Sequence, residues 1–372
     1  MMPAPTPSSA WSHCPGGWNN TARWPIAAAA AKAAGSDAEQ QLLRLADSEQ
    51  LQAYVEKWTA QPTQRTPPLL HQSWKSCELP FKQNVWQQQC ERVLNKNWTS
   101  LLWTDEDNRN FIATHYPSFL ELYDGYDVKI KRIDAVRYFY LWHFGGVYID
   151  LDIACLRSFD TYKSLEGRAL LPDSHAVFAF NNKAYNCIDG TCLRDKTEAV
   201  PNAFMAAPPR HPFFAVAIHT LQTTANHTRK GRSHPLPATG PVFLTTRLFK
   251  WIHSAGHSNT TTIHSKNAVF NWMPGLNGHR HPCGFTAMNP TQTNDTSGSK
   301  RDWTQHDKLH YDKVFAQCAS HLRTTAMTTF WTASWAPEWK DEMEKLKNST
   351  TAAAESDDDD TAAQTSGGEH DV

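Results

Sequence analysis

Residues 145–152 read Gly-Gly-Val-Tyr-Ile-Asp-Leu-Asp, and this short stretch carries most of the information on both the architecture and the site. The glycine pair ends a helical pattern, and an apolar run that closes on two aspartates follows it. We expect a strand from Val147 to Ile153, on which side chains two residues apart point the same way. Asp150 and Asp152 would then project from one face of this strand, while Leu151 points into a core.

Two neighbouring carboxylates repel each other and are stabilised by a cation. Carboxylate oxygens select hard divalent ions such as Mg²⁺ or Mn²⁺. An ion of this kind bridges the diphosphate of a nucleotide and neutralises the charge that develops as the diphosphate leaves. The preceding helix adds opposite charges on one face, because Asp134 and Arg137 lie at i and i+3. A surface salt bridge is the alternative interpretation of this pair.

Strands and helices alternate through the first half of the chain, which indicates a parallel α/β sheet. Apolar spacing and turn residues predict strands at Leu69–Trp74 and Trp98–Trp103, and helices at Pro80–Leu94, from Thr104, and at Val128–Phe144. A Ser36–Glu39 capping box predicts an earlier helix that ends near Pro62. In the second half we expect a strand at Phe204–Ala207 and helices at Pro212–Thr223 and Pro241–His253.

The chain divides into three parts by composition. We expect a flexible segment at 1–35, a single domain at 36–345 with insertions at about 180–200 and 285–305, and a disordered acidic tail at 346–372. The last eighteen residues hold seven acids and no Lys or Arg, so the rest of the chain is mildly basic. A basic body suits an anionic ligand such as a nucleotide diphosphate.

Cysteines and glycosylation sequons both favour the secretory lumen. The eight cysteines include no CxxC pair with zinc-binding spacing. Two disulfides could form, one between Cys187 and Cys192 and one between Cys283 and Cys318, and the sequence does not decide between pairings. Six Asn-x-Ser/Thr sequons occur, at Asn19, Asn97, Asn226, Asn259, Asn294 and Asn348. Free buried thiols and accidental sequons are the alternative. Neither a signal peptide nor an apolar stretch of membrane-spanning length is recognised in the sequence.

Four separate stretches together resemble the DXD-containing sugar transferases of glycosyltransferase family 32. They are His71–Trp74, Trp103–Glu106, Arg132–Tyr138 and 145–152. This family includes Golgi mannosyltransferases and the catalytic subunits that mannosylate inositol phosphoceramide. The resemblance is good over about residues 69–217, and the stretches 201–207 and 211–214 are most similar to the inositol-phosphoceramide branch.

The resemblance implies a GT-A-like fold, with a Rossmann-type, mostly parallel sheet flanked by helices. It also implies roles for nine residues. The implied catalytic residues are Asp134, Arg137, Asp150 and Asp152; the implied metal ligands are Asp150, Asp152 and Ser334; the implied donor-binding residues are Trp74, Asp134, Arg137, Gly145, Gly146, Asp150, Ser334 and Trp335. Trp74 would stack on the nucleotide base, and Ser334 with Trp335 would close over the metal and the β-phosphate.

The implied activity is a metal-dependent, retaining transfer of a hexose. The favoured donor is GDP-mannose with Mn²⁺ or Mg²⁺, and the acceptor would be a glycan or an inositol phosphoceramide-type glycolipid. A UDP-sugar donor on the same fold is one alternative, and a non-catalytic carbohydrate- or nucleotide-binding relative is another. The resemblance further implies localisation in the Golgi or secretory lumen or association with a membrane. We expect no nucleic-acid partner, and a membrane-anchoring partner subunit is one candidate partner.

Overall fold

The computed structural model describes ten ranges of the chain: 37–45, 48–61, 63–94, 97–164, 167–180, 200–224, 234–254, 257–264, 270–272 and 325–329. The predicted segment 1–35, nearly all of both predicted insertions and the acidic tail lie outside these ranges, as do Cys187, Cys192, Cys283 and Cys318. Within the described residues, no helix combines the length and the apolar character needed to cross a membrane.

A six-stranded mixed sheet forms the centre of the molecule, in the order β2-β1-β3-β6-β5-β7. Its strands are β1 (Leu69–Ser73), β2 (Thr99–Trp103), β3 (Gly146–Ile149), β5 (Ala176–Ala179), β6 (Phe204–Ala207) and β7 (Thr261–His264). Strand β1 pairs in parallel with β2 and β3, and β5 pairs in parallel with β7, whereas β6 runs antiparallel to both β3 and β5. Five strands therefore run in one direction and β6 in the other. The predicted α/β class with a mostly parallel sheet is confirmed.

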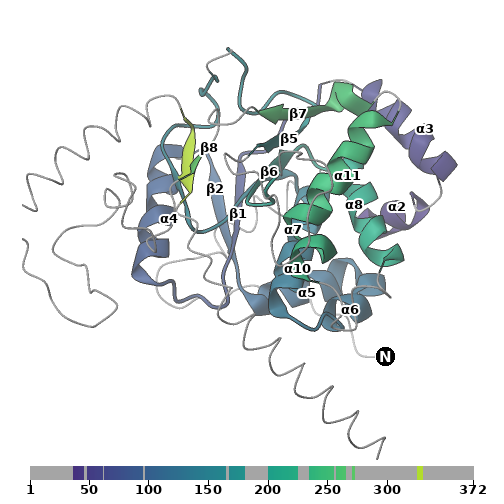
Figure 1. Ribbon diagram of the computed structural model, residues 1–372, viewed down its shortest axis with the longest axis horizontal. Coiled ribbons are helices and arrows are strands. Elements are labelled where there is room, and N and C mark those ends of the chain that lie inside the picture. Colours follow the sequence, from purple (N-terminus) through teal and green to yellow (C-terminus); the bar gives the residue numbers. More distant parts are fainter. Residues whose placement is uncertain are drawn as a thin grey trace, which may run out of the picture.

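Helices cover both faces of this sheet (Figure 1). They are α2 (Ala38–Arg44), α3 (Ser48–Thr59), α4 (Phe81–Leu94), α5 (Asp105–His115), α6 (Pro117–Asp124), α7 (Lys129–His143), α8 (Pro212–Thr223), α10 (Pro235–Ala238) and α11 (Pro241–His253), with a 3₁₀ turn η1 at His257–Thr260. Helix α4 packs on one face with Leu70, Val147 and Ile149. The helices around α7 pack on the other face, where Tyr148 points. Alternation along β3 thus turns Tyr148 towards α7 and its two neighbours towards α4.

Most helices begin and end where the sequence predicts. Helices α8 and α11 have the predicted bounds, and both begin with a proline, whose missing N–H costs nothing in the first turn. Helix α5 begins after Thr104, whose hydroxyl accepts a hydrogen bond from the backbone N–H of Asp107 while the Asp107 carboxylate accepts from the Thr104 N–H. The predicted strands at β1, β2 and β6 are confirmed within one residue.

Two local predictions are wrong. The first helix is capped by Asp37 without a side-chain hydrogen bond, and its Glu39 instead accepts from the backbone N–H of Ser118 at 2.9 Å. The helix therefore begins one residue after the predicted start, Glu39 makes a tertiary contact, and Ser36 itself lies outside the described residues. The predicted strand from Val147 to Ile153 is also interrupted, because the Ile153 N–H donates to the carbonyl of Asp150 at 3.1 Å and closes a turn.

A second, three-stranded sheet lies next to this turn. It contains β4 (Ile153–Cys155), β8 (Phe270–Trp272) and β9 (Met327–Thr329), in the order β4-β9-β8. A disulfide joins Cys90 on α4 to Cys155 on β4, and no sequence pattern predicted this pair. The Gln89 side-chain amide also donates to the Cys155 carbonyl at 3.1 Å. Strand β4 is therefore fixed to α4 directly after the turn.

Candidate active site

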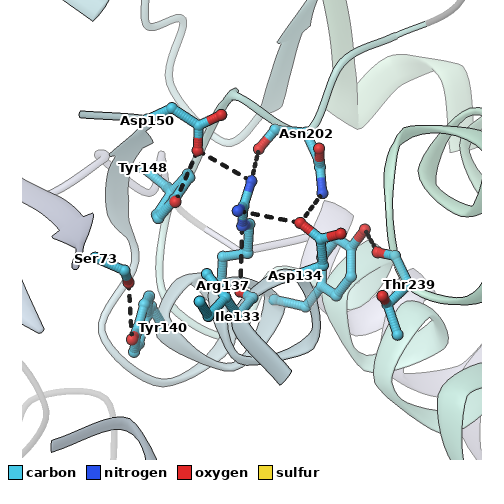
Figure 2. Close-up of polar contacts among 10 residues, drawn as sticks. Ser73, Ile133, Asp134, Arg137, Tyr140, Tyr148, Asp150, Asn202 and Thr239 are labelled. Carbon is cyan, nitrogen blue, oxygen red and sulfur yellow. Dashed lines mark hydrogen bonds and ion pairs between the residues drawn. The ribbon is translucent and has the colours of Figure 1, made fainter. Parts of the chain in front are cut away.

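A buried arginine connects helix α7 to the end of strand β3. Arg137 lies in the middle of α7, and its side chain is only 5% exposed. Its guanidinium lies 3.1 Å from the Asp134 carboxylate and 3.2 Å from the Asp150 carboxylate. The structure therefore brings together three residues that the sequence singled out, and Figure 2 shows Arg137 between the two acids.

The remaining donors of Arg137 also have partners. Its Nη1 donates to the carbonyl of Asn202 at 3.0 Å, and its Nε donates to the carbonyl of Ile133 at 3.2 Å. The guanidinium also lies over the ring of Tyr148, with Cζ 4.5 Å from the ring centroid. A planar guanidinium with partners on several sides has one orientation, so its charge is held in a fixed position.

Asp150 differs from the other members of this cluster because it is partly open to solvent. Its side chain is 34% exposed, against 7% for Asp134. One oxygen, Oδ1, accepts from Tyr148 Oη at 2.9 Å and faces Arg137. The other oxygen is directed away from Arg137 (Figure 2). Asp150 can therefore take a ligand from solvent without giving up its contact with the arginine.

The sequence did not single out Tyr148 and Asn202 as members of the site. Asn202, just before β6, donates through Nδ2 to Asp134 Oδ1 at 2.9 Å, and its carbonyl accepts from Arg137. For Tyr148 a signal existed, since the alternation that turns Asp150 to one face of β3 turns Tyr148 to the same face. For Asn202 no local pattern pointed to Asp134, because the contact joins residues 68 positions apart.

The electrostatics of this cluster centre on Asp134. The pKa of the Asp134 carboxyl is raised to about 6, mainly by burial and to a smaller extent by the charge of Asp150, while Arg137 and the Asn202 amide oppose the shift. Asp134 consequently titrates close to neutral pH, where a small change in its surroundings alters its charge. Burial likewise raises the pKa of the Tyr148 phenol well above its ordinary value. The hydroxyl therefore stays protonated and donates a hydrogen bond to Asp150.

Asp152 and Trp74 both lie at the C-terminal ends of parallel strands, as Asp150 does. Asp152 is in the turn between β3 and β4 and is partly buried, so it does not share a strand face with Asp150 as predicted. Strand β1 pairs with β3 in a register that places Ser73 level with Asp150, and Trp74 follows Ser73. The Trp74 backbone N–H donates to the carbonyl of Trp103 at 2.9 Å, and the residue is half-buried, with its indole Nε1 inaccessible to solvent.

Gly145 and Gly146 lie elsewhere, at the beginning of β3. Both have positive φ angles, 66° and 96°. A Cβ at Gly145 would lie 2.5 Å from the backbone nitrogen of Pro209, and one at Gly146 would lie 2.7 Å from the carbonyl oxygen of Leu69. Close packing therefore explains both glycines, and the structure does not bring them to the Asp150 cluster.

A buried histidine holds this packed end of the strand. His71 accepts from the Trp103 indole N–H through Nδ1 at 3.2 Å, so its proton is on Nε2, which donates to the Gly145 carbonyl at 2.9 Å. Burial lowers the pKa of His71 to about 4, although the bond to Gly145 opposes this. The neutral imidazole is a structural link between β1, β2 and the glycine turn.

Ser334 and Trp335 lie outside the described residues. The described chain does reach the neighbourhood of the site shortly before them, because β9 pairs with β4 and places Thr329 opposite Ile153. Ile153 directly follows Asp152 in sequence. Strand β9 thus ends beside the turn that carries the two aspartates, five residues before Ser334.

The chemistry of the cluster fits a hard divalent cation held together with an anionic ligand. Within the described ranges, no group of three His, Cys, Asp or Glu side chains could hold a metal by itself. Asp150 does offer one outward oxygen, and Asp152 is two residues away in a tight turn. Such a pair suits an ion like Mg²⁺, which is usually bound by one or two carboxylates plus phosphate oxygens.

Comparison with known proteins agrees with this chemistry. Residues 80–169 match the family model described as "Glycosyltransferase sugar-binding region containing DXD motif". The chain is 34% identical over 237 residues to mannosyl phosphorylinositol ceramide synthase CSH1 of Saccharomyces cerevisiae, a match that covers 60% of this chain and 56% of that protein. It is 33% identical over 191 residues to inositol phosphoceramide mannosyltransferase 2 of Schizosaccharomyces pombe, covering 50% and 46%.

The chain therefore matches about half the length of these curated relatives. A solved structure, "PaToxG Glycosyltransferase", aligns with 61% of this chain and 79% of its own, at 13% identity and a TM-score of 0.34. The residues that the family model matches, 80–169, include Asp134, Arg137 and Asp150. The resemblance to the DXD-containing sugar transferases that the sequence predicts is confirmed.

Proposed function

Since the chain is related to the DXD-containing sugar transferases, we propose that it is a metal-dependent glycosyltransferase that moves mannose from GDP-mannose. The observation that carries the proposal is the fixed series Asp134–Arg137–Asp150, at the edge of the sheet where the parallel strands end. Ligands of open α/β sheets bind at this edge. The named mannosyltransferases among the relatives support mannose as the transferred sugar.

The proposed donor lies across the end of β3. Asp150 and Asp152 would hold Mg²⁺ or Mn²⁺, with Ser334 as a further ligand, and the ion would neutralise charge on the leaving diphosphate. Arg137 supplies a second positive charge that its partners hold in place. Preorganised charge of this kind stabilises a transition state without reorganisation during the reaction. Trp74, at the same edge, would stack on the base.

Asp134 sits on the buried side of Arg137 and would contact the donor sugar. Its pKa of about 6 keeps it ionised at neutral pH, where it fixes the guanidinium by charge and accepts from Asn202. In the proposed retaining reaction, the acceptor hydroxyl attacks on the face from which the diphosphate leaves. The role of the residues is then to position the donor and to stabilise the leaving group.

The acceptor that the relatives favour is an inositol phosphoceramide-type glycolipid. We place the reaction in the Golgi or secretory lumen, where a buried disulfide such as Cys90–Cys155 is stable. A partner subunit that anchors the enzyme to the membrane would give it access to a lipid acceptor.

Donor hydrolysis tests the proposal most directly. GDP-mannose, UDP-glucose and UDP-galactose would each be incubated with the protein and Mn²⁺, with and without a chelator. We expect slow hydrolysis of GDP-mannose, lost on chelation and in Asp152→Asn. Asp173→Asn is the matched control, because this exposed carboxylate precedes β5 at the opposite edge of the sheet.

Each outcome of this assay has a distinct meaning. Hydrolysis of a UDP-sugar alone would replace the proposed donor and keep the enzyme class. Metal-dependent nucleotide binding without turnover of any donor or transfer to any acceptor would indicate a non-catalytic relative. Equal loss of activity in Asp173→Asn and Asp152→Asn would contradict the assigned site.

A further inference from the structure

Two glycosylation sequons fall within the described residues, and both present an exposed asparagine. Asn97 lies in the turn between α4 and β2, and Asn259 lies in η1 just before β7. Both side chains are exposed. By contrast Asn108 and Asn202, which are in no sequon, are 0% and 6% exposed. The sequon asparagines are therefore positioned as attachment sites would be.

The rest of each sequon is held firmly in place. Trp98 is buried and donates from its indole N–H to Asp160 at 2.8 Å, which fixes the turn with Asn97 outwards. In the second sequon, Thr261 accepts from the Trp251 indole N–H at 3.0 Å. The Trp251 ring also stacks on His257, the first residue of η1, with 3.7 Å between centroids.

Both asparagines lie where parallel strands begin, whereas the candidate active site lies where these strands end. Asn97 precedes β2, which is parallel to β1 and therefore to β3. Asn259 precedes β7, which runs in the same direction as β3 because β6 is antiparallel to both β3 and β5, and β5 is parallel to β7. Asp150 follows the end of β3, whereas both sequons come before the beginning of a strand. A glycan at either position would leave the site open.

The disulfide gives independent support for the compartment in which such modification occurs. Cys90 and Cys155 are both completely buried, and their bond links α4, which ends just before Asn97, to β4. Disulfides of this kind form and persist in the oxidising lumen where oligosaccharides are attached to asparagine.

We propose that Asn97 and Asn259 are N-glycosylation sites. In the modification, the side-chain Nδ2 of asparagine bonds to the anomeric carbon of a lipid-diphosphate-linked oligosaccharide. The bond between that carbon and the diphosphate oxygen breaks, the lipid diphosphate leaves with the electron pair, and the amide loses one proton. Thr99 is buried in the folded protein, so modification of Asn97 precedes the packing of β2.

Peptide mapping of the full-length protein from the cells that produce it tests the proposal. Enzymatic release of N-glycans in H₂¹⁸O converts each occupied asparagine to an ¹⁸O-labelled aspartate, which mass spectrometry detects. We expect the label at Asn97 and at Asn259. Recovery of both peptides without the label would overturn the proposal, and recovery of one without the label would overturn that site.

Matched variants separate sequon loss from structural damage. Asn97→Gln and Asn259→Gln should each remove one glycan and should leave donor hydrolysis unchanged. Thr99→Ser and Thr261→Ser keep the sequons and the hydroxyl groups, so they should keep both glycans. Loss of the glycan in a serine variant would contradict the sequon as its cause. Donor hydrolysis is scored separately, so failure of the proposed activity would leave this result intact.

Discussion

The two ends of strand β3 are built in opposite ways. At its beginning, Gly145 and Gly146 fit against the backbone of Pro209 and Leu69, and a neutral buried histidine holds the Gly145 carbonyl. At its end, the strand opens into a charged turn where Asp150 is 34% exposed. Strand β3 is only four residues long, so the packed end lies close to the reactive one. The packing at the beginning of the strand fixes the position of a carboxylate whose second oxygen can bind a ligand.

The largest expected effect comes from filling the packed end. Gly145→Ala should lower the free energy of unfolding by about 2–6 kcal/mol, since a strained φ and an overpacked contact each cost about 1–3 kcal/mol. Urea unfolding followed by circular dichroism measures the change. Gly167→Ala is the control, because Gly167 has a similar φ of 77° but a Cβ added there would have no other atom within 4 Å.

Gly167→Ala should therefore cost only the conformational strain, about 1 kcal/mol. If Gly145→Ala instead folds with normal stability and loses nucleotide affinity, the glycine contacts the donor and the contrast between the two ends of β3 is wrong.

The next effect comes from removing charge at the open end. Asp150→Asn keeps the size of the side chain and should reduce donor hydrolysis about 10²- to 10³-fold, the usual cost of losing one electrostatic contact to a transition state. The free energy of unfolding should fall by about 1–3 kcal/mol, because Arg137 is buried and would keep only Asp134 as its ion-pair partner. Steady-state kinetics and urea unfolding, measured on the same sample, separate the two quantities. A folded variant with undiminished hydrolysis would exclude Asp150 from the reaction.

A third effect concerns acid stability at the packed end. The unfolded chain binds a proton at His71 near pH 6.5, whereas the folded protein does so only near pH 4. The folded state therefore loses stability as pH falls between these values, by about 3 kcal/mol from this residue alone. Urea unfolding at pH 7 and pH 4.5 should show this loss in the wild type, and a smaller one in His71→Gln. The exposed His253→Gln should resemble the wild type.

The smallest effect is the pH dependence of activity that Asp134 sets. With a pKa of about 6 for Asp134, donor hydrolysis should fall about tenfold for each pH unit below that value as its charge is lost. Asn202→Leu removes a hydrogen bond that favours the ionised carboxylate, so the acidic limb of the profile should move to higher pH. An unmoved limb in a folded Asn202→Leu variant would assign the titration to another group.

Patterns of local origin could be predicted from the sequence, and contacts between distant segments could not. Helices α8 and α11 have an apolar spacing and a proline in the first turn, and both were located correctly. The interrupted strand was not, because period-two alternation continues through residues 150–152 even though a turn forms there. Strands β5 and β7 are four residues long and were missed.

In the candidate site, too, only residues close together in the sequence could be predicted. The acids and the arginine could be named because they lie within twenty residues of each other, around one helix and one strand. Asn202 completes the cluster from just before β6, and Cys90 pairs with Cys155 across 65 residues. Neither contact has a periodic signal, since each depends on how the sheet is assembled.

The pairing of β4 with β9 has a consequence for the order of assembly during synthesis. Strand β4 directly follows the aspartate turn near residue 153, but its partner lies near residue 329. The nascent chain can pair β1, β2 and β3 long before β9 has left the ribosome, and contacts between distant segments form slowly. The aspartate turn is therefore braced on its second side only after residue 329 has been synthesised. A ribosome-bound chain could already contain Arg137 and Asp150. It would still lack β9, the strand that pairs with β4 directly after the aspartate turn.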